Sequence, residues 1–476
     1  MEPKGNKYEV VILGSGLSGL IAGTLLSTQN HSVLLLTEKG SKPYFEKEGY
    51  RFIPFSNFSE KILKSSLLPN VSKRLGLLPI GEKRGPKNEK GKKERVAFQV
   101  ILPKSRIDLY QDILLLKKEL RREFPEEMLE VEKFYGEMAR IGNSIKRVKT
   151  HEPISPPLPM REKSLIKNRF YLEQSPFSKE FKRFLQLQWI PYGNLHSDWI
   201  PISFLAFHLL NEETDEGVEP NDLEILKNQI FKKFLHSGGR AEEIVGVDRI
   251  EMGWRKGMTL SLKGEKREVH AHILVFNSPL NRLSPLLGEK RKKISKFEEK
   301  IQTRYLLIPI FLGVQEKVVP VGMRDLLISL LDLEKPFENG NLLYISLSPK
   351  GDESMAPEGR RALIAEGWMS LEKWNQGLFD QFREGVLNHL KRLIPFLEDH
   401  LEFIDWGWAL EEVPRWSYSH FIYEPPDEFN WRDGVIPTRI SKNLYLIGKE
   451  NFPYLGLEGE LLSGLKVGDE ILKRFH

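Results

Sequence analysis

The fold is decided by residues 8–23, which read Tyr8-Glu-Val-Val-Ile-Leu-Gly-Ser-Gly-Leu-Ser-Gly-Leu-Ile-Ala-Gly23. The apolar run at the start is typical of a strand buried on both faces, and the spacing after the glycines is helical. In the turn between them, Gly14 permits a tight bend, Gly16 a close backbone approach to a phosphate, and Gly19 close packing of helix on strand. The helix N-terminus adds unpaired N–H groups and a positive dipole end. The pattern predicts a dinucleotide site at Gly14, Ser15, Gly16, Leu17, Ser18 and Gly19.

A second apolar strand supports this interpretation. Residues 33–37 are followed by Glu38, at the spacing expected for a carboxylate that accepts hydrogen bonds from an adenosine ribose, and then by Lys39. A strand, a glycine turn, a helix, a second strand and an acid in this order are more specific than the glycines alone. The alternative is a glycine-rich core turn in another kind of α/β protein.

Length and composition limit the classes of protein to consider. The chain has 476 residues, 40% of them hydrophobic and 29% charged, which is typical of a globular protein with two domains or one large discontinuous domain. Glycines interrupt the apolar residues 10–26, so we expect neither a membrane span nor a signal sequence, and a cytoplasmic protein. Cysteine is absent, which excludes disulfides, iron–sulfur clusters and cysteine nucleophiles. Redox chemistry would therefore need a bound cofactor.

The net charge of +5 is a mild excess and predicts no nucleic-acid partner. Positive charge is concentrated in residues 81–95, which fit either a solvated loop or a surface that touches anionic lipid headgroups. His270 and His272 share one face of a predicted strand, but two ligands do not make a metal site, and we predict none.

The remaining pattern alternates between strands and helices. Strands are predicted at residues 50–53, 96–102, 240–250, 258–262, 269–276, 305–314, 326–331, 342–347 and 444–447. Helices are predicted at about residues 108–149 with a break at Pro125, and at 163–210, 223–236, 287–302, 371–393 and 459–472. The last strand, glycine and helix repeat the N-terminal arrangement, so a second helix N-terminus is expected to point at the same ligand.

Four blocks of sequence together resemble the superfamily of flavin-dependent phytoene desaturases and amine oxidases. They are residues 14–19 with Glu38, residues 98–109, residues 238–250 and residues 443–464. The resemblance implies an FAD-adenosine site in the first block, a substrate-region strand pair in the second, and a valine that brackets the adenine at Val247. It implies contacts beside the flavin in the last block, at Gly448, Lys449, Glu458 and Gly459.

The chain departs from the family pattern at two positions. The family has a double glycine after the ribose acid, where this sequence offers only Gly40, and it has an acid where this sequence has Lys449. Either change weakens an implied flavin contact. Glu450 could replace the acid by a shift of one residue, or Lys449 could pair with a phosphate.

Aromatic residues are dense between residues 403 and 431. They fit either a flat wall for a conjugated substrate, an amine cage, or ordinary core. Trp416 and Tyr418 lie shortly before the C-terminal motif and are the predicted substrate contacts. We name no catalytic acid or base, since in this superfamily the flavin carries the hydride and the protein positions the reactants.

We therefore expect an α/β fold with a discontinuous Rossmann-like FAD-binding domain, residues 1–60, 222–285 and 435–476, and an α+β substrate domain, residues 61–221 and 286–434. The resemblance implies an FAD-dependent, desaturase-like oxidoreductase that transfers hydride between flavin and an apolar, isoprenoid-like small molecule, with peripheral membrane contact as an option. The alternatives are a flavin amine oxidase and a cofactor-degenerate binding protein without turnover.

Overall fold

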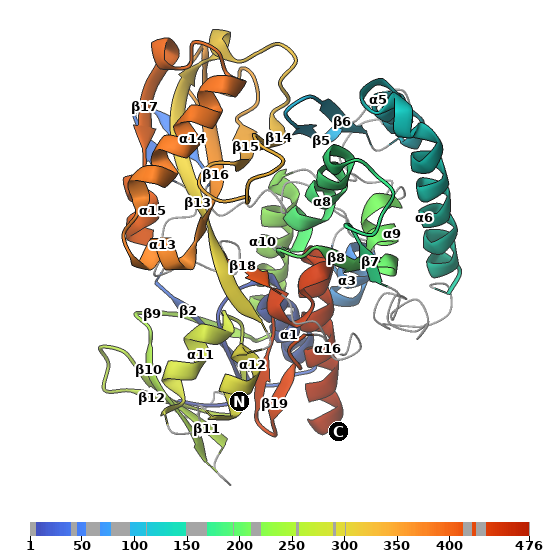
Figure 1. Cartoon of the computed structure of the whole chain (residues 1–476). Coiled ribbons are helices and arrows are strands. Elements are labelled where there is room, and N and C mark those ends of the chain that lie inside the picture. Colours follow the sequence, from blue (N-terminus) through green and yellow to red (C-terminus); the bar gives the residue numbers. More distant parts are fainter. Residues whose placement is uncertain are drawn as a thin grey trace.

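The computed structural model describes residues 6–39, 45–53, 67–77, 96–110, 112–148, 169–193, 195–210, 220–253, 257–288, 292–299, 301–412, 421–424 and 435–475. Two large sheets organise these segments, one in the lower part of Figure 1 and one in the upper left. No helix in these ranges is both long and apolar enough to cross a lipid bilayer.

The first sheet is built around β1 (Lys7–Leu13), which pairs in parallel with β12 (Glu268–Phe276) on one side and β2 (Val33–Glu38) on the other. Val10, Val11 and Ile12 are fully buried, which explains the unbroken apolar run in the sequence. The other strands are β9 (Arg240–Ile244) beside β2, β11 (Gly257–Leu262) and β10 (Val247–Gly253) beyond β12, and β19 (Arg439–Ser441) with β20 (Leu444–Leu446), which pairs in parallel with β12.

The helix α1 (Leu17–Thr28) is buried along most of its length between this sheet and two other helices, α16 (Leu457–Phe475) and α10 (Pro220–His236). Two glycines of α16 allow the close approach to α1. A Cβ on Gly464 would lie 2.6 Å from the Ser18 carbonyl oxygen, and one on Gly468 would lie 2.8 Å from Leu25. A third short helix, α3 (Leu68–Leu75), also packs on α1 and α16.

The second sheet has the strand order β17-β13-β16-β15-β14-β5-β6, with β18 also paired to β13. The strands are β5 (Val96–Ile101), β6 (Arg106–Tyr110), β13 (Gln302–Gln315), β14 (Leu326–Leu330), β15 (Leu342–Leu347), β16 (Arg360–Ser370), β17 (Leu401–Asp405) and β18 (Phe421–Glu424). The helices α13 (Leu371–Asn375), α14 (Phe379–Leu393) and α15 (Gly407–Glu412) pack with this sheet. The long antiparallel pair β13–β16 is its centre.

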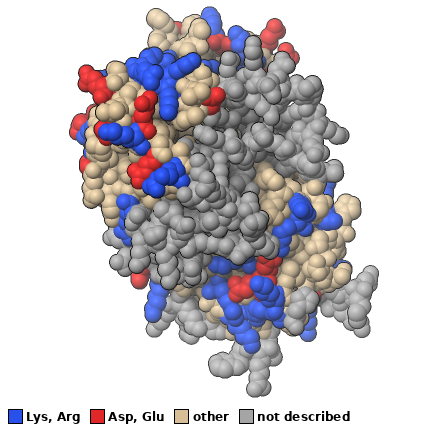
Figure 2. Space-filling model, turned by 90° about the vertical axis from the view of Figure 1, so that its right-hand side faces the viewer, with Lys and Arg blue, Asp and Glu red and all other residues tan. Residues whose placement is uncertain are grey.

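Helices cover the right-hand side of the molecule in Figure 1. They are α5 (Ile113–Glu123), α6 (Met128–Val148), α8 (Lys179–Gly193) and α9 (Ile202–Leu210), with the short pair β7 (Arg169–Tyr171) and β8 (Trp199–Pro201). Two more helices, α11 (Leu280–Leu286) and α12 (Lys292–Glu298), follow β12. On the face in Figure 2, basic and acidic side chains are interspersed among neutral ones.

Several element predictions were wrong. Residues 240–250 form two strands on opposite edges of the first sheet, because the chain leaves β9 at Val245 and Gly246 and starts again as β10. The expected helix at 287–302 is replaced by α11 and α12, and β16 was not predicted at all. The strand β16 is buried on both faces, so its sequence lacks the alternation that marks a half-buried strand.

One hairpin differs from the expected domain order. The strands β3 (Phe45–Lys47) and β4 (Tyr50–Phe52) pack against the second sheet, where Tyr50 and Phe52 form an aromatic cluster with Phe311 and Phe403. The sequence had placed residues 45–52 in the first domain. The hairpin joins the two sheets close to the start of the chain.

Candidate dinucleotide site

The three glycines of the predicted turn surround one side chain, Asn277, at the end of β12. The Asn277 Oδ1 atom accepts a hydrogen bond from the Gly19 N–H (3.0 Å), and its Nδ2 atom donates to the Ile447 carbonyl oxygen (3.0 Å). A Cβ at Gly14, Gly16 or Gly19 would lie 2.2–2.7 Å from an oxygen of Asn277. Asn277 thus fixes the turn between β1 and α1 to the end of β20.

This geometry explains why each position is glycine. Gly14 has a φ of +107°, which side chains rarely adopt, so the bend needs glycine for its backbone as well as for space. The space beside Gly16, which the sequence assigned to an approaching phosphate, holds the Asn277 amide. Gly19 allows close packing as predicted, since its missing Cβ would also lie 2.9 Å from the Gly14 carbonyl oxygen.

The outer side of the turn is open. Ser15 and Gly16 are exposed, and Gly16 is the N-cap of α1 without a side-chain cap. Within the described residues, the backbone N–H groups of Gly16, Leu17 and Ser18 have no protein acceptor. Leu17 and Ser18 are themselves buried, and a buried helix N-terminus without partners is unfavourable unless a ligand satisfies it. These N–H groups and the helix dipole fit an anionic pyrophosphate.

The predicted adenosine end comes together beside this turn. The Glu38 carboxylate lies close to Gly246, directly before Val247, where a Cβ would be 3.7 Å from Glu38 Oε1. The Lys39 N–H donates to the Ile244 carbonyl oxygen (2.6 Å), which holds the end of β2 against β9. Glu38 and Val247 therefore share one corner of the sheet.

Arg282 in α11 also reaches this corner and was not predicted. Its Nη2 atom pairs with Glu38 Oε2, and its Nη1 atom donates to Ser278 Oγ (3.3 Å). Glu38 and Arg282 are both about one-third exposed, at 37% and 36% of their side chains. The ion pair fixes one carboxylate oxygen of Glu38 and leaves Oε1 for a ribose hydroxyl.

The C-terminal motif reaches the same turn through α16. Gly448 has a φ of +142° and donates its N–H to Ser463 Oγ (3.2 Å). Ser463 and Ser18 are joined by their hydroxyls (3.1 Å), and Ser18 Oγ also donates to the Glu460 carbonyl oxygen (3.0 Å). The expected return of a distant strand, glycine and helix to the first helix is therefore present.

Lys449 and Glu450 are turned into the protein. Lys449 is 5% exposed, and its ammonium lies 3.7 Å from Glu460 in the first turn of α16. The carboxylate of Glu450, 3% exposed, accepts a hydrogen bond from the Leu280 N–H (2.8 Å). Burial raises the pKa of Glu450 to about 7, and nearby Glu298 adds to this, whereas the Leu280 N–H and the Tyr423 side chain oppose it.

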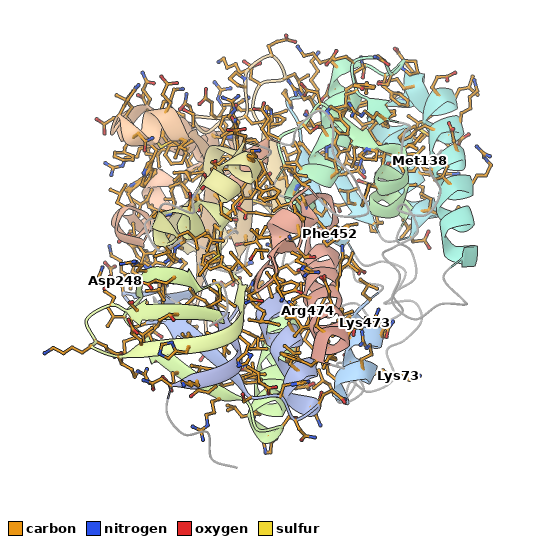
Figure 3. All side chains as sticks on the ribbon, turned by 90° about the horizontal axis from the view of Figure 1, so that it is seen from below. Lys73, Met138, Asp248, Phe452, Lys473 and Arg474 are labelled. Atoms are coloured by element: carbon orange, nitrogen blue, oxygen red, sulfur yellow. The ribbon has the colours of Figure 1, made fainter. Side chains whose placement is uncertain are left out.

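Glu458 and Gly459 hold the chain between β20 and α16. The Glu458 Oε1 atom accepts a hydrogen bond from the Leu67 N–H (3.1 Å), and a Cβ on Gly459 would lie 2.4 Å from the Phe452 carbonyl oxygen. Figure 3 shows Phe452 in the interior of the molecule, whereas Asp248 on β10 lies at an outer edge. The contacts of these two positions are with the protein itself.

Other candidate residues stand apart from the turn. Trp416, Tyr418, Gly40 and the basic residues 81–95 lie outside the described residues. His270 bonds through Nδ1 to Thr259 Oγ1 (3.0 Å), and the described residues contain no group of three or more His, Asp or Glu that could hold a metal ion. The residue that sequence reasoning missed is Asn277, whose only signal was a polar side chain directly after a buried strand next to β1.

The comparisons with known proteins agree with this geometry. No protein-family model matches the chain. The chain is 22% identical over 511 residues to a chloroplastic prolycopene isomerase of Arabidopsis thaliana, covering 96% of this chain and 81% of that protein. It is 23% identical over 525 residues to the corresponding protein of Daucus carota, covering 97% and 79%.

Similar solved structures span nearly the whole chain. A putrescine oxidase double mutant has a TM-score of 0.61 at 14% identity, covering 98% of this chain and 99% of that one. The cyclohexylamine oxidase of Brevibacterium oxydans has a TM-score of 0.57 at 15% identity, with the same coverage. An oxidoreductase from Methanosarcina mazei has a TM-score of 0.56 at 14% identity, covering 97% and 100%.

These likenesses confirm the predicted fold class, a Rossmann-like sheet combined with a second, mixed α/β region. They also support the suspected superfamily of phytoene desaturases and flavin amine oxidases, and with it FAD as the cofactor of an oxidoreductase. The substrate is a separate question.

Proposed function

We propose that this chain is an FAD-dependent oxidoreductase of the desaturase type, which transfers hydride between an apolar, isoprenoid-like small molecule and flavin. The observation that carries the proposal is the open N-terminus of α1, where three backbone N–H groups await an anion beside an acid at ribose spacing. The full-length similarity to prolycopene isomerases supports the desaturase type over other chemistries of the same fold.

The residues that hold the cofactor are assigned by their place in this site. Gly16, Leu17 and Ser18 would bind the pyrophosphate through backbone N–H groups, and Glu38 would accept hydrogen bonds from the ribose, held in place by Arg282. Bound FAD supplies the hydride acceptor or donor. The chain contributes binding and orientation, and Asn277 keeps the turn in the conformation that presents its N–H groups.

The first test is the flavin content of the purified protein. We expect a yellow solution that absorbs at about 450 nm, as flavoproteins do, or uptake of added FAD by colourless protein. A Gly16→Val variant should lose this flavin, because its side chain meets Asn277 and reshapes the turn. Retention of flavin by Gly16→Val would contradict the assigned site. A variant of exposed Gly136, whose Cβ would meet nothing within 4 Å, is the control.

Two observations favour a second candidate, a relative that binds a ligand without turnover. Glu38 is already engaged by Arg282, and Lys449 stands where the family has an acid. Protein that stays colourless after incubation with FAD would support this candidate. Anaerobic bleaching of bound flavin by a polyene lipid would support the desaturase type, and bleaching by primary amines or polyamines would support an amine oxidase instead.

We further propose that the chain works beside a membrane in the cytoplasm, because an apolar substrate must be drawn from lipid, and that basic residues 81–95 provide the contact. The domain division proposed from the sequence, with its boundaries near residues 60, 222, 286 and 435, accompanies this assignment. Co-sedimentation with anionic but not neutral vesicles, lost when residues 81–95 are deleted, is the expected result.

A further inference from the structure

A cavity of about 510 Å³ lies in the second sheet region, away from the glycine turn. Its walls are the turn between β5 and β6, the end of β14 and the last turns of α14, in the upper part of Figure 1. This volume is within the range of small-molecule sites. The cavity shares no lining residue with the dinucleotide site described above.

Three cations line this cavity: Lys104 and Arg106 in the β5–β6 turn, and Arg392 at the end of α14. Their side chains are exposed and have no ion-pair or hydrogen-bond partner in the described part of the chain. The lining contains one acid, Glu123, which is already paired with Arg122 (2.7 Å). The cavity therefore carries a net positive charge that the protein does not neutralise.

Neighbouring cations behave differently. Arg122 pairs with Glu119 as well as Glu123, and Arg324 pairs with Asp108 through Nη2 (2.5 Å). Positive charge in this region is thus usually matched by an acid, except around the cavity. The carbonyl end of α14 adds a partial negative charge there, so attraction of an anion must come from the three side chains.

The inner wall combines apolar and neutral polar groups. Apolar lining comes from residues such as Ile101, Leu330 and Leu393. Deeper in, His389 bonds through Nδ1 to the Gly340 carbonyl oxygen (2.6 Å) and through Nε2 to Ser329 Oγ (2.8 Å). Burial lowers the pKa of His389 to about 4, with Arg392 adding to this, so the ring is neutral and donates from Nδ1.

The three features point to one class of ligand. The rim presents cations in water, where a doubly charged group loses little hydration, and the wall behind it presents apolar surface with a neutral imidazole. We propose that this cavity binds a phosphate monoester carried on a short apolar chain, with the phosphate at Lys104, Arg106 and Arg392 and the chain against the apolar wall. Such a ligand differs in chemistry and in place from the dinucleotide.

The test uses the full-length protein and soluble octyl phosphate below its micellar concentration. Isothermal titration should show binding that weakens as salt rises, and inorganic phosphate should bind at least tenfold more weakly than octyl phosphate, because it lacks the apolar chain. Butyl phosphate should fall between them. Inorganic phosphate that binds as tightly as octyl phosphate would overturn the apolar part of the site.

The double variant Arg106→Gln with Arg392→Gln should lower octyl phosphate affinity at least tenfold. The matched control is Arg121→Gln, which removes an exposed cation of the adjacent helix α5 that pairs with Glu132 and does not line the cavity. Unchanged affinity in the double variant, or an equal loss in the control, would overturn the assignment.

The source of the phosphate is separated by a second arm with vesicles that contain phosphatidic acid. Binding of monomeric octyl phosphate that the double variant loses assigns a soluble ester. Binding confined to the vesicles and lost in the same variant assigns a lipid headgroup. Absence of both, in protein whose flavin content is normal, overturns this inference and leaves the proposed function intact.

Discussion

Asn277→Asp is the change that most directly tests where the cofactor's anion lies. The substitution keeps the shape of the side chain and keeps an acceptor for the Gly19 N–H, but it removes the donor to the Ile447 carbonyl oxygen. An unsatisfied buried carbonyl costs about 1–3 kcal/mol of folding free energy. The new carboxylate also lies directly behind Gly16, where the missing Cβ would be 2.7 Å from the side-chain oxygen.

The effect on binding follows from Coulomb's law. Two unit charges about 6 Å apart repel by about 3 kcal/mol at an effective dielectric constant of about 20. A pyrophosphate held by the N–H groups of Gly16 and Leu17 would feel most of this repulsion, so FAD affinity should fall about 30- to 100-fold. Fluorescence titration of apoprotein with FAD measures the affinity, and urea unfolding measures the stability.

Two further variants separate charge from structure. Asn277→Ala removes both hydrogen bonds without adding charge, so it should cost more stability than Asn277→Asp but weaken FAD binding less. Asn30→Asp adds the same charge at the other end of α1, where Asn30 already has a φ of +64°, and should leave affinity unchanged. Undiminished FAD affinity in Asn277→Asp would refute the placement of the anion at this turn.

Three other changes test the surrounding structure. Gly464→Ala should destabilise the protein by about 1–3 kcal/mol, since the added Cβ would lie 2.6 Å from a backbone oxygen of α1, whereas Gly136→Ala on exposed α6 should stabilise it by about 0.5–1 kcal/mol; urea unfolding that ranks them in reverse would contradict the packing. Arg282→Gln frees the Glu38 carboxylate to rotate, and we expect FAD to bind about threefold to tenfold more weakly by titration; tighter binding would mean that the ion pair competes with the ribose. Burial raises the pKa of Glu450 from its usual 4.5 to about 7, so the folded state holds a proton that the unfolded chain releases, and this contribution is complete below pH 4.5 and lost as pH rises through 7. Glu450→Gln should therefore gain about 3 kcal/mol over the wild type at pH 8 and show a flatter stability profile between pH 5 and 8 in urea unfolding; an unchanged profile would assign the pH dependence to other groups.

The first strand, turn and helix could be predicted because local sequence determines them. A strand buried on both faces must be continuously apolar, and the bend at Gly14 needs a backbone that only glycine adopts easily. The same holds for Glu38, since the lengths of α1 and β2 fix its distance from the turn. Residues 240–250 failed for the opposite reason: their strand-forming residues give no sign that the chain crosses from one edge of the sheet to the other.

The partners of the predicted residues could not be read in the same way, because they come from segments far apart in the sequence. Asn277 is 258 residues from Gly19 and Ser463 is 445 from Ser18, and neither has a spacing that marks it. The two departures from the family pattern gain a physical meaning only through such contacts. Lys449 is matched by Glu460, and Glu450 serves the Leu280 N–H, so neither side chain needs a cofactor phosphate to be satisfied. Cofactor affinity in this chain must therefore depend mainly on the backbone N–H groups at the start of α1, and for that reason Asn277, which fixes that backbone, is expected to matter more for FAD binding than either Lys449 or Glu450.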